Sequence, residues 1–197
     1  MVGSQMYQLC YSTRWESDLS SVKQIAAGDS HTCALLTGGT VKCWGREANG
    51  RLANGATSNH SKAGDAVKVA SGGEKLTKVS QIAAGADHTC ALIDVSSDDD
   101  PSNPGSYSDN IVKCWGEEDY KRLGNNSTDN QNYPVSFHVS PSDPNDLTGI
   151  QKVVAGEKDT CVILANDDVK CRGGSFTDNT DNSQDFTDFG HYLEVVP

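Results

Sequence analysis

The chain has 197 residues, of which 27 are acidic and 16 are basic, so its formal net charge is −11 at pH 7 and its pI is about 4.7. Binding to nucleic acid or to an anionic membrane depends on concentrated lysine and arginine, and this balance argues against both as partners. No apolar run approaches the ~20 residues needed to span a bilayer, so we expect no membrane insertion.

The N-terminal segment, residues 1–21, contains Cys10 and a group of aromatic residues. We expect it to form a partial repeat or an interface. Cys10 has three alternatives: a buried thiol, the remnant of a preceding copy of a repeated segment, or a bridge between chains. Tyr11 and Trp15 are candidates for a ligand-binding surface because aromatic rings stack on sugars and proteins, although packing in a core or an interface is the alternative.

From residue 22 onward the chain repeats one segment three times. The copies read VKQIAAG, HTCALL, VKCWG in residues 22–45, then VSQIAAG, HTCALI, VKCWG in residues 79–116, then IQKVVAG, DTCVIL, VKCRG in residues 150–173. A fixed period of this size is typical of solenoids, propellers and repeat arrays. We therefore predict three repeats at about residues 22–78, 79–149 and 150–174.

Each copy is expected to contain a β-hairpin closed by a disulfide. Short apolar runs lie on either side of turn residues, as in ALL, TGGT, VKCW at residues 34–44. Opposing residues on antiparallel strands have Cα atoms roughly 4.5 to 5.5 Å apart, which a disulfide can span. The predicted pairs are Cys33 with Cys43, Cys90 with Cys114, and Cys161 with Cys171.

A single insertion explains the uneven spacing of the repeats. Gly28 and Gly85 are 57 residues apart, whereas Gly85 and Gly156 are 71 apart, and the cysteines of the second copy are 14 residues further apart than those of the others. The insertion, residues 96–109, falls at a hairpin tip, and such loops often bind partners. Asp98, Asp99, Asp100 and Tyr107 are therefore candidate ligand-binding residues. A solvated turn is the alternative, and calcium is a minor option because the insertion has no calcium-loop pattern.

Paired cysteines at hairpin spacing indicate an oxidising compartment, so we expect an extracellular or cell-surface protein. Zinc is the rival interpretation, but the spacings match no common zinc motif. We expect no metal and no cofactor.

The copies resemble the regulator-of-chromosome-condensation repeat family of β-propellers. The residues that carry the resemblance are AAG-x-x-HTCAL, the hairpin ending in VKCWG, and the following NGRLANG (residues 49–55) or KRLGNNS (residues 121–127). The form that bears disulfides is similar to secreted bacterial members, including a propeller-type β-lactamase inhibitor protein. The resemblance implies an all-β fold, a partial or oligomer-completed β-propeller built from three disulfide-stapled repeats.

The third copy departs from the pattern, since Arg172 stands where tryptophan is expected. We interpret it as a terminal copy that has lost packing residues, with residues 175–197 as a cap or closing strand. Propellers have about four to eight blades, so three copies do not close a ring. We therefore expect a homo-oligomer, with a trimer preferred.

His31 and His88 recur at one position of the repeat, and Asp159 replaces them in the third copy. This argues for a structural role, and we expect each imidazole to hydrogen-bond a backbone group within its own blade. Trp44 and Trp115 are expected to pack within the repeats.

Three classes of function remain. The favoured one is a non-catalytic extracellular recognition or adhesion module that binds a glycan or protein through its loops, as a trimeric fibre tip would. The alternative is a secreted inhibitor or regulator of a partner enzyme. An enzyme is disfavoured, because the sequence has no nucleophile elbow, phosphate loop or zinc-protease helix motif.

Overall fold

The computed structural model describes residues 19–55, 58–95, 110–140, 143–146, 149–174 and 187–188, and it confirms the all-β fold. The strands are β1 (Val22–Ala27), β2 (His31–Leu36), β3 (Val41–Gly45), β4 (Val79–Ala84), β5 (His88–Ile93), β6 (Ile111–Gly116), β7 (Gln131–Ser136), β8 (His138–Ser140), β9 (Asp143–Asp146), β10 (Ile150–Ala155), β11 (Asp159–Leu164), β12 (Val169–Gly173) and β13 (Thr187–Asp188). One 3-10 turn, η1 (Asp119–Lys121), follows β6. Across these ranges, none of the helical structure is long and apolar enough to cross a membrane.

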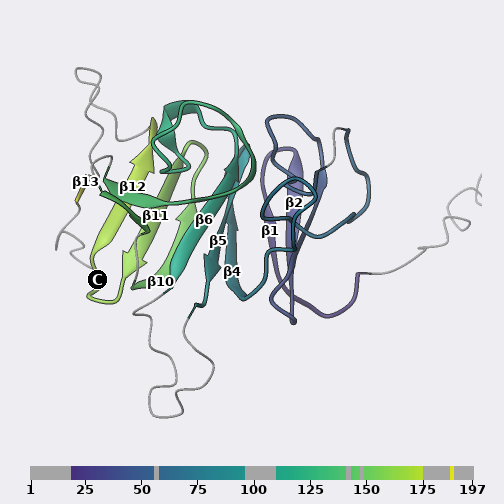
Figure 1. Ribbon diagram of the computed structural model, residues 1–197, viewed down its shortest axis with the longest axis horizontal. Coiled ribbons are helices and arrows are strands. Elements are labelled where there is room, and N and C mark those ends of the chain that lie inside the picture. Colours follow the sequence, from purple (N-terminus) through teal and green to yellow (C-terminus); the bar gives the residue numbers. More distant parts are fainter. Residues whose placement is uncertain are drawn as a thin grey trace, which may run out of the picture.

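Each repeat forms one antiparallel sheet, which we call a blade. Blade 1 contains β1-β2-β3, blade 2 contains β4-β5-β6-β7, and blade 3 contains β10-β11-β12-β13. Blade 2 stands between the other two, as Figure 1 shows, and the strands of the three sheets run side by side. In blade 1, single bridges from His60 to Gly45 and from Ala66 to Lys42 take the place of a regular fourth strand.

The three predicted disulfides are confirmed. Cys33 faces Cys43, Cys90 faces Cys114 and Cys161 faces Cys171 across neighbouring strands, with Cα atoms 4.1, 4.1 and 4.0 Å apart. These sulfurs are therefore bonded to each other, which excludes the zinc alternative for these six cysteines. The insertion of blade 2 lies beyond the last pair of its hairpin, Ile93 with Ile111, so it lengthens the turn without changing the strand register.

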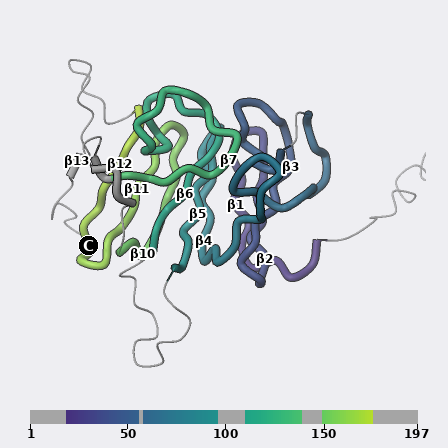
Figure 2. Tube along the Cα trace, in the orientation of Figure 1, coloured from purple at the N-terminus to yellow at the C-terminus, as the bar shows by residue number. Residues whose placement is uncertain are grey.

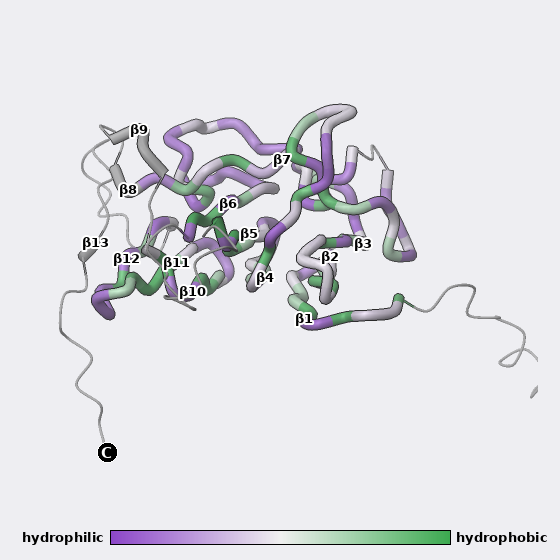
Figure 3. Tube along the Cα trace, turned by 60° about the horizontal axis from the view of Figure 1, so that its bottom comes forward, coloured by the Kyte–Doolittle hydropathy of each residue, from purple (hydrophilic) through white to green (hydrophobic). Residues whose placement is uncertain are grey.

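Apolar side chains fill the space between consecutive blades. The first core cluster joins Leu35 and Val41 of blade 1 to Ile82 and Trp115 of blade 2. The second cluster joins Leu92 of blade 2 to partners in blade 3 that include Ile150, Val153 and Val162. Figure 3 shows hydrophobic segments along these strands and mainly hydrophilic segments in the loops at their ends. Because both sides of blade 2 are covered, its central strand β5 is buried along its whole length.

Glutamine side chains join the inner strands of the blades. The amide of Gln24 donates to the Ile82 carbonyl oxygen at 2.7 Å and accepts from the Ile82 N–H at 2.9 Å. Gln81 makes the same two bonds with Val153 in blade 3, at 3.0 and 3.1 Å. The trace in Figure 2 shows β4 running between β1 and β10, the strands that these amides bridge. Lys152 takes the glutamine position in blade 3.

That Arg172 marks a terminal copy stays a prediction, because its side chain packs toward the preceding blade and says nothing of a following one. Its side chain is buried, and its Nη1 donates to Oδ1 of Asn126 in the preceding blade at 3.0 Å. Trp115, at the same position of blade 2, also reaches backward and donates from Nε1 to the Arg51 carbonyl oxygen at 3.0 Å. The position faces the preceding blade, so a different residue there does not identify the last blade of an array.

Glycine is required where the inner strand turns into the next strand of blades 1 and 2. A Cβ on Gly85 would overlap the His88 ring and the Gly156 carbonyl oxygen, and a Cβ on Gly28 would overlap the His31 ring and the Gly85 carbonyl oxygen. A Cβ on Gly156 would meet nothing closer than Asp159, at 3.9 Å.

We predict that Gly85→Ala destabilises the chain by about 1–3 kcal/mol, the usual cost of overpacking, whereas Gly156→Ala leaves it unchanged. Urea unfolding of both variants in dilute solution measures the difference. Equal losses in the two variants would contradict the proposed contact between glycine and histidine.

Candidate functional site

The turns that follow the inner strands gather at one end of the blades. Together they line an open depression of about 380 Å³, formed by Ala27, Gly28, Asp29, Ala84, Gly85, Ala86, Ala155, Gly156 and Glu157. The N–H of Asp29 donates to the Ala86 carbonyl oxygen at 3.1 Å, and the N–H of Ala86 donates to the Glu157 carbonyl oxygen at 3.3 Å. The walls of the depression are thus largely backbone and small side chains. The turns of blades 1 and 3 each add one carboxylate, from Asp29 and Glu157.

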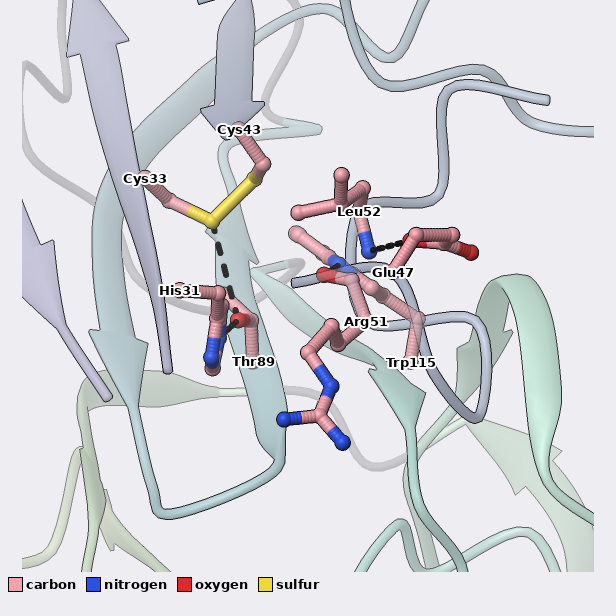
Figure 4. Close-up of a disulfide and its surroundings, with 8 residues drawn as sticks. All are labelled: His31, Cys33, Cys43, Glu47, Arg51, Leu52, Thr89 and Trp115. Atoms are coloured by element: carbon pink, nitrogen blue, oxygen red, sulfur yellow. Dashed lines mark hydrogen bonds between the residues drawn. A yellow bond between two sulfur atoms is a disulfide. The ribbon is translucent and has the colours of Figure 1, made fainter. Parts of the chain in front are cut away.

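The recurring histidines connect neighbouring blades, so the expectation of a backbone partner within each blade was wrong. His31 Nε2 shares a hydrogen bond with the Thr89 hydroxyl of blade 2 at 2.7 Å, and His88 Nε2 shares one with the Thr160 hydroxyl of blade 3 at 2.9 Å. Figure 4 shows the first of these beside the Cys33–Cys43 disulfide, whose Cys33 sulfur lies 3.7 Å from the same hydroxyl. Both histidines nevertheless make buried packing contacts, as expected for a structural role.

Burial makes both histidines poor acid–base groups. Desolvation, followed by the nearby Arg51 guanidinium, lowers the pKa of His31 to about 4. Desolvation and Arg122 lower the pKa of His88 to about 3. Both rings are therefore neutral at physiological pH and closed off from solvent, which suits packing rather than proton transfer.

The loop after the third strand is built alike in blades 1 and 2. A glutamate accepts the backbone N–H five residues later: Glu47 from Leu52 at 3.1 Å, and Glu118 from Leu123 at 2.8 Å. Desolvation raises the pKa of Glu118 to about 8, despite the opposing effect of its Leu123 hydrogen bond. An arginine then folds back, with Arg122 Nε donating to the Asp119 carbonyl oxygen at 2.7 Å.

The two interfaces between consecutive blades, which we call seams, differ in charge at the turn end of the blades. Between blades 1 and 2, Arg51 forms an ion pair with Asp87. Between blades 2 and 3, Lys158 stands at the position of Asp87, and Arg122 pairs instead with Glu117 of its own blade at 3.1 Å. At this position, the seam between blades 2 and 3 therefore has a basic residue, Lys158, where the seam between blades 1 and 2 has the acidic Asp87.

Tyr120 lies at that altered seam and is 51% exposed. The Lys158 ammonium is 5.5 Å from the centre of its ring, and the Arg122 guanidinium is 5.8 Å from it, both within cation–π range. We call Tyr120, Lys121 and Lys158 the seam cluster. It presents an exposed aromatic ring beside the Lys158 ammonium, which also lies 3.8 Å from Oε1 of Glu157.

Tyr120 and Lys121 also have an unfavourable backbone conformation. Their φ angles are 65° and 58°, in the left-handed region. In blade 1 the corresponding residues are Asn49 and Gly50, with φ of 60° and 80°, and these two residue types adopt this region readily. Blade 2 thus keeps two residues that cost stability at an exposed turn, a feature common at functional sites.

The ligand-binding residues expected from the sequence, Tyr11, Trp15, Asp98, Asp99, Asp100 and Tyr107, lie outside the described residues, as does Cys10. The structure therefore neither joins them to the seam cluster nor separates them from it. The seam cluster itself was missed. Alignment of the copies, which sets Tyr120-Lys121 against Asn49-Gly50, contained the signal that could have found it.

No group of three or more histidine, cysteine, aspartate or glutamate side chains is arranged to hold a metal ion within the described ranges.

Comparison with known proteins agrees with this architecture. Residues 22–51 and 38–92 match the family models described as the regulator of chromosome condensation (RCC1) repeat. Residues 22–92 are thus similar to RCC1-type repeats. Over 103 residues it is 38% identical to the ultraviolet-B receptor UVR8 of Arabidopsis thaliana, a match that covers 52% of this chain and 19% of UVR8.

Solved structures show the same fold at lower identity. Human WBSCR16 is 21% identical, with a TM-score of 0.55, over 79% of this chain and 34% of that one. A chain in the structure of Kap60 bound to yeast RCC1 (Prp20) is 16% identical, with a TM-score of 0.59, over 86% of this chain and 37% of that one. The chain therefore spans about a fifth to somewhat over a third of the length of these proteins.

The buried titratable groups predict a stability maximum between acid and mildly alkaline pH. Unfolded histidine titrates near 6.5, so the free energy of unfolding should fall as the pH drops from about 6.5 toward the folded pKa values of about 4 and 3. Each unit of difference is worth about 1.4 kcal/mol. Glu118 acts in the opposite direction: its contribution is complete below about 4.5 and is lost as the pH rises toward 8.

Denaturant titrations from pH 3 to 9 on the wild type, Glu118→Gln and His88→Gln measure these contributions. We expect Glu118→Gln to remove the decline above neutrality and His88→Gln to reduce the decline below pH 6.5. Unchanged pH profiles in both variants would contradict the assignment.

Proposed function

We propose that this chain is a non-catalytic recognition module that acts outside the cell and binds a protein or glycan through the loops at the turn end of its blades. The observation that carries the proposal is the seam cluster: an exposed tyrosine in a strained turn, flanked by cations. Three disulfides support an oxidising compartment.

The chemistry of the seam cluster favours a partner with an acidic group next to a flat apolar surface. The Tyr120 ring can stack on a sugar or a side chain, while Lys158, whose side chain is 47% exposed, can pair with a carboxylate of the partner in place of Glu157, 3.8 Å away. Yeast RCC1, which is similar in fold, is bound to Kap60 in its solved structure, so a protein with this fold can have a protein partner. The adhesion role, and a trimeric fibre tip in particular, stay proposals.

The first test is a glycan array, with acidic saccharides included, together with affinity capture from extracellular fluid. A saccharide or protein that binds the wild type in a saturable manner supports recognition. A tight 1:1 complex with one enzyme, accompanied by loss of that enzyme's activity, would instead favour the inhibitor alternative. If no partner of either kind were found, the proposal would fail.

We predict that Tyr120→Asn separates binding from folding. Asparagine tolerates the left-handed conformation, so the variant should gain about 1 kcal/mol in unfolding free energy. It should lose most of its affinity for the partner, since the ring is gone. Titration calorimetry and thermal melting measure the two effects.

Lys158→Asp introduces the acidic residue found at this position in blade 2 and should also weaken binding. The matched control is Lys75→Ala, which changes an exposed lysine in the segment that connects β3 to β4. A Tyr120→Asn variant that binds as tightly as the wild type would remove the seam cluster from the site.

A further inference from the structure

The residue that follows strand β12 supports the seam cluster from below. A Cβ on Gly174 would lie 3.0 Å from Cγ of the Tyr120 ring and 3.2 and 3.3 Å from its two Cδ atoms. The Gly174 N–H also donates to the Lys158 carbonyl oxygen at 3.2 Å. The Tyr120 ring therefore lies against the backbone of blade 3, at the residue that is bonded to Lys158. Since Tyr120 remains half-exposed, it offers a flat apolar surface from a fixed position.

An asparagine-rich loop, residues 125–132, follows the turn that contains the exposed tyrosine. Its sequence, NNSTDNQN, has only amide, hydroxyl and carboxylate side chains. Oδ1 of Asn126 accepts from Nη1 of Arg172 in β12 at 3.0 Å. Oδ1 of Asn130 accepts from the Glu118 N–H at 2.9 Å. Because the protein holds each of these oxygens, the NH2 group on the other side of each amide has a fixed direction and can donate to a ligand.

The surface around Tyr120 is more typical of a sugar site than of a protein interface. Among residues 46–55 and 117–130, the described loops after the third strands, Tyr120 is the one large hydrophobic side chain that is exposed. The centre of a protein–protein interface usually contains several apolar or aromatic side chains packed together. A pyranose requires less: one aromatic ring for its C–H face, and a few donors and acceptors for the hydroxyls at its edge.

Lys158 favours a negative charge on that sugar. Its ammonium is 5.5 Å from the centre of the Tyr120 ring, so it can reach a group that stacks on the ring. Its ion pair with Glu157, at 3.8 Å, joins two exposed side chains, so the pair contributes little and a ligand carboxylate can replace Glu157. Burial raises the pKa of Glu118 to about 8, so this carboxyl is mostly uncharged at pH 7 and does not repel an anion.

We propose that the seam cluster binds a hexuronic acid residue of a glycan. The apolar face of the pyranose stacks on the Tyr120 ring, its carboxylate pairs with the Lys158 ammonium, and Asn126 lies at the edge of the site as a hydrogen-bond donor. Gly174 is a positioning residue, because a side chain there would displace the ring from blade 3. This inference rests on the proposed recognition function and narrows its partner to one chemical class.

Two matched sugars test the class of ligand. Methyl glucuronide has a carboxylate where methyl glucoside has a hydroxymethyl group, and the two are otherwise alike. Titration of each sugar into the isotope-labelled full chain, followed by NMR, measures both the affinity and the location of binding. We expect the glucuronide to shift the backbone amides of Tyr120, Lys158 and Gly174 in a saturable manner. The glucoside should bind about two- to fivefold more weakly, the usual range for one exposed ion pair.

Glu157→Gln gives the sharpest result, because it removes the carboxylate that competes for Lys158. This variant should bind the glucuronide about two- to fivefold more tightly than the wild type does, and its affinity for the glucoside should be unchanged. Lys158→Gln should make the affinities for the two sugars equal. A gain of affinity that is confined to the charged sugar is not expected from a general change in stability.

Gly174→Ala tests the support of the ring. It should weaken the binding of both sugars by about fivefold, within the range of one aromatic contact. Gly38→Ala is the matched control, since a Cβ there would meet nothing within 4 Å. Urea unfolding shows whether both variants stay folded, and Tyr120→Asn removes the same stacking surface without a change at Gly174.

Three results would each overturn the inference: no shift with either sugar, equal affinity of the wild type for both sugars, or a Glu157→Gln variant that gains no affinity for the glucuronide. The proposed recognition function has a separate outcome. If the sugars failed but a purified protein partner bound the wild type and not Tyr120→Asn, recognition by the seam cluster would stand and the glycan class would be wrong.

Discussion

The hydrogen bond between a histidine of one blade and a threonine of the next joins each consecutive pair of described blades and is buried within the seam between them. A buried imidazole without a partner would cost a few kcal/mol of desolvation, and the threonine hydroxyl provides that partner at 2.7 and 2.9 Å. The two groups come from different blades, as do Gln24 and Ile82. Each of these histidines thus has its Nε2 paired by the next blade, so part of the stability belongs to pairs of blades rather than to single ones.

The same seam explains where the exposed chemistry lies. Neighbouring turns approach so closely that Gly28 and Gly85 have no room for a side chain, so the depression at the end of the inner strands is lined largely by backbone and alanine. Side chains that differ between blades lie instead in the loops after the third strand, where Tyr120-Lys121 of blade 2 corresponds to Asn49-Gly50 of blade 1. The turns after the inner strands are thus similar from blade to blade, whereas the loops after the third strands differ in their side chains.

Much of the fold could be predicted from the sequence because it depends on local spacing. The repeat period, the hairpins and the pairs Cys33–Cys43, Cys90–Cys114 and Cys161–Cys171 all follow from distances along the chain. The partner of His31 could not be predicted, since it lies 58 residues away on another sheet. Likewise, the spacing of Arg172 identified its strand position but not which neighbouring blade that position faces. The seam cluster depends on Lys158 meeting a loop of the preceding blade, a contact between repeats that spacing does not encode.

The hairpin of blade 2 shows how the array accommodates added sequence. Between the base of the hairpin and the insertion, its two strands are held together by the Cys90–Cys114 disulfide and by the pairing of Ile93 with Ile111. The entropy of closing a loop grows slowly with length, by about 0.6 kcal/mol for each doubling. Foreign peptides of varied length could therefore be grafted at this tip while the blades keep their packing, which makes the second hairpin a natural display position on a covalently reinforced scaffold.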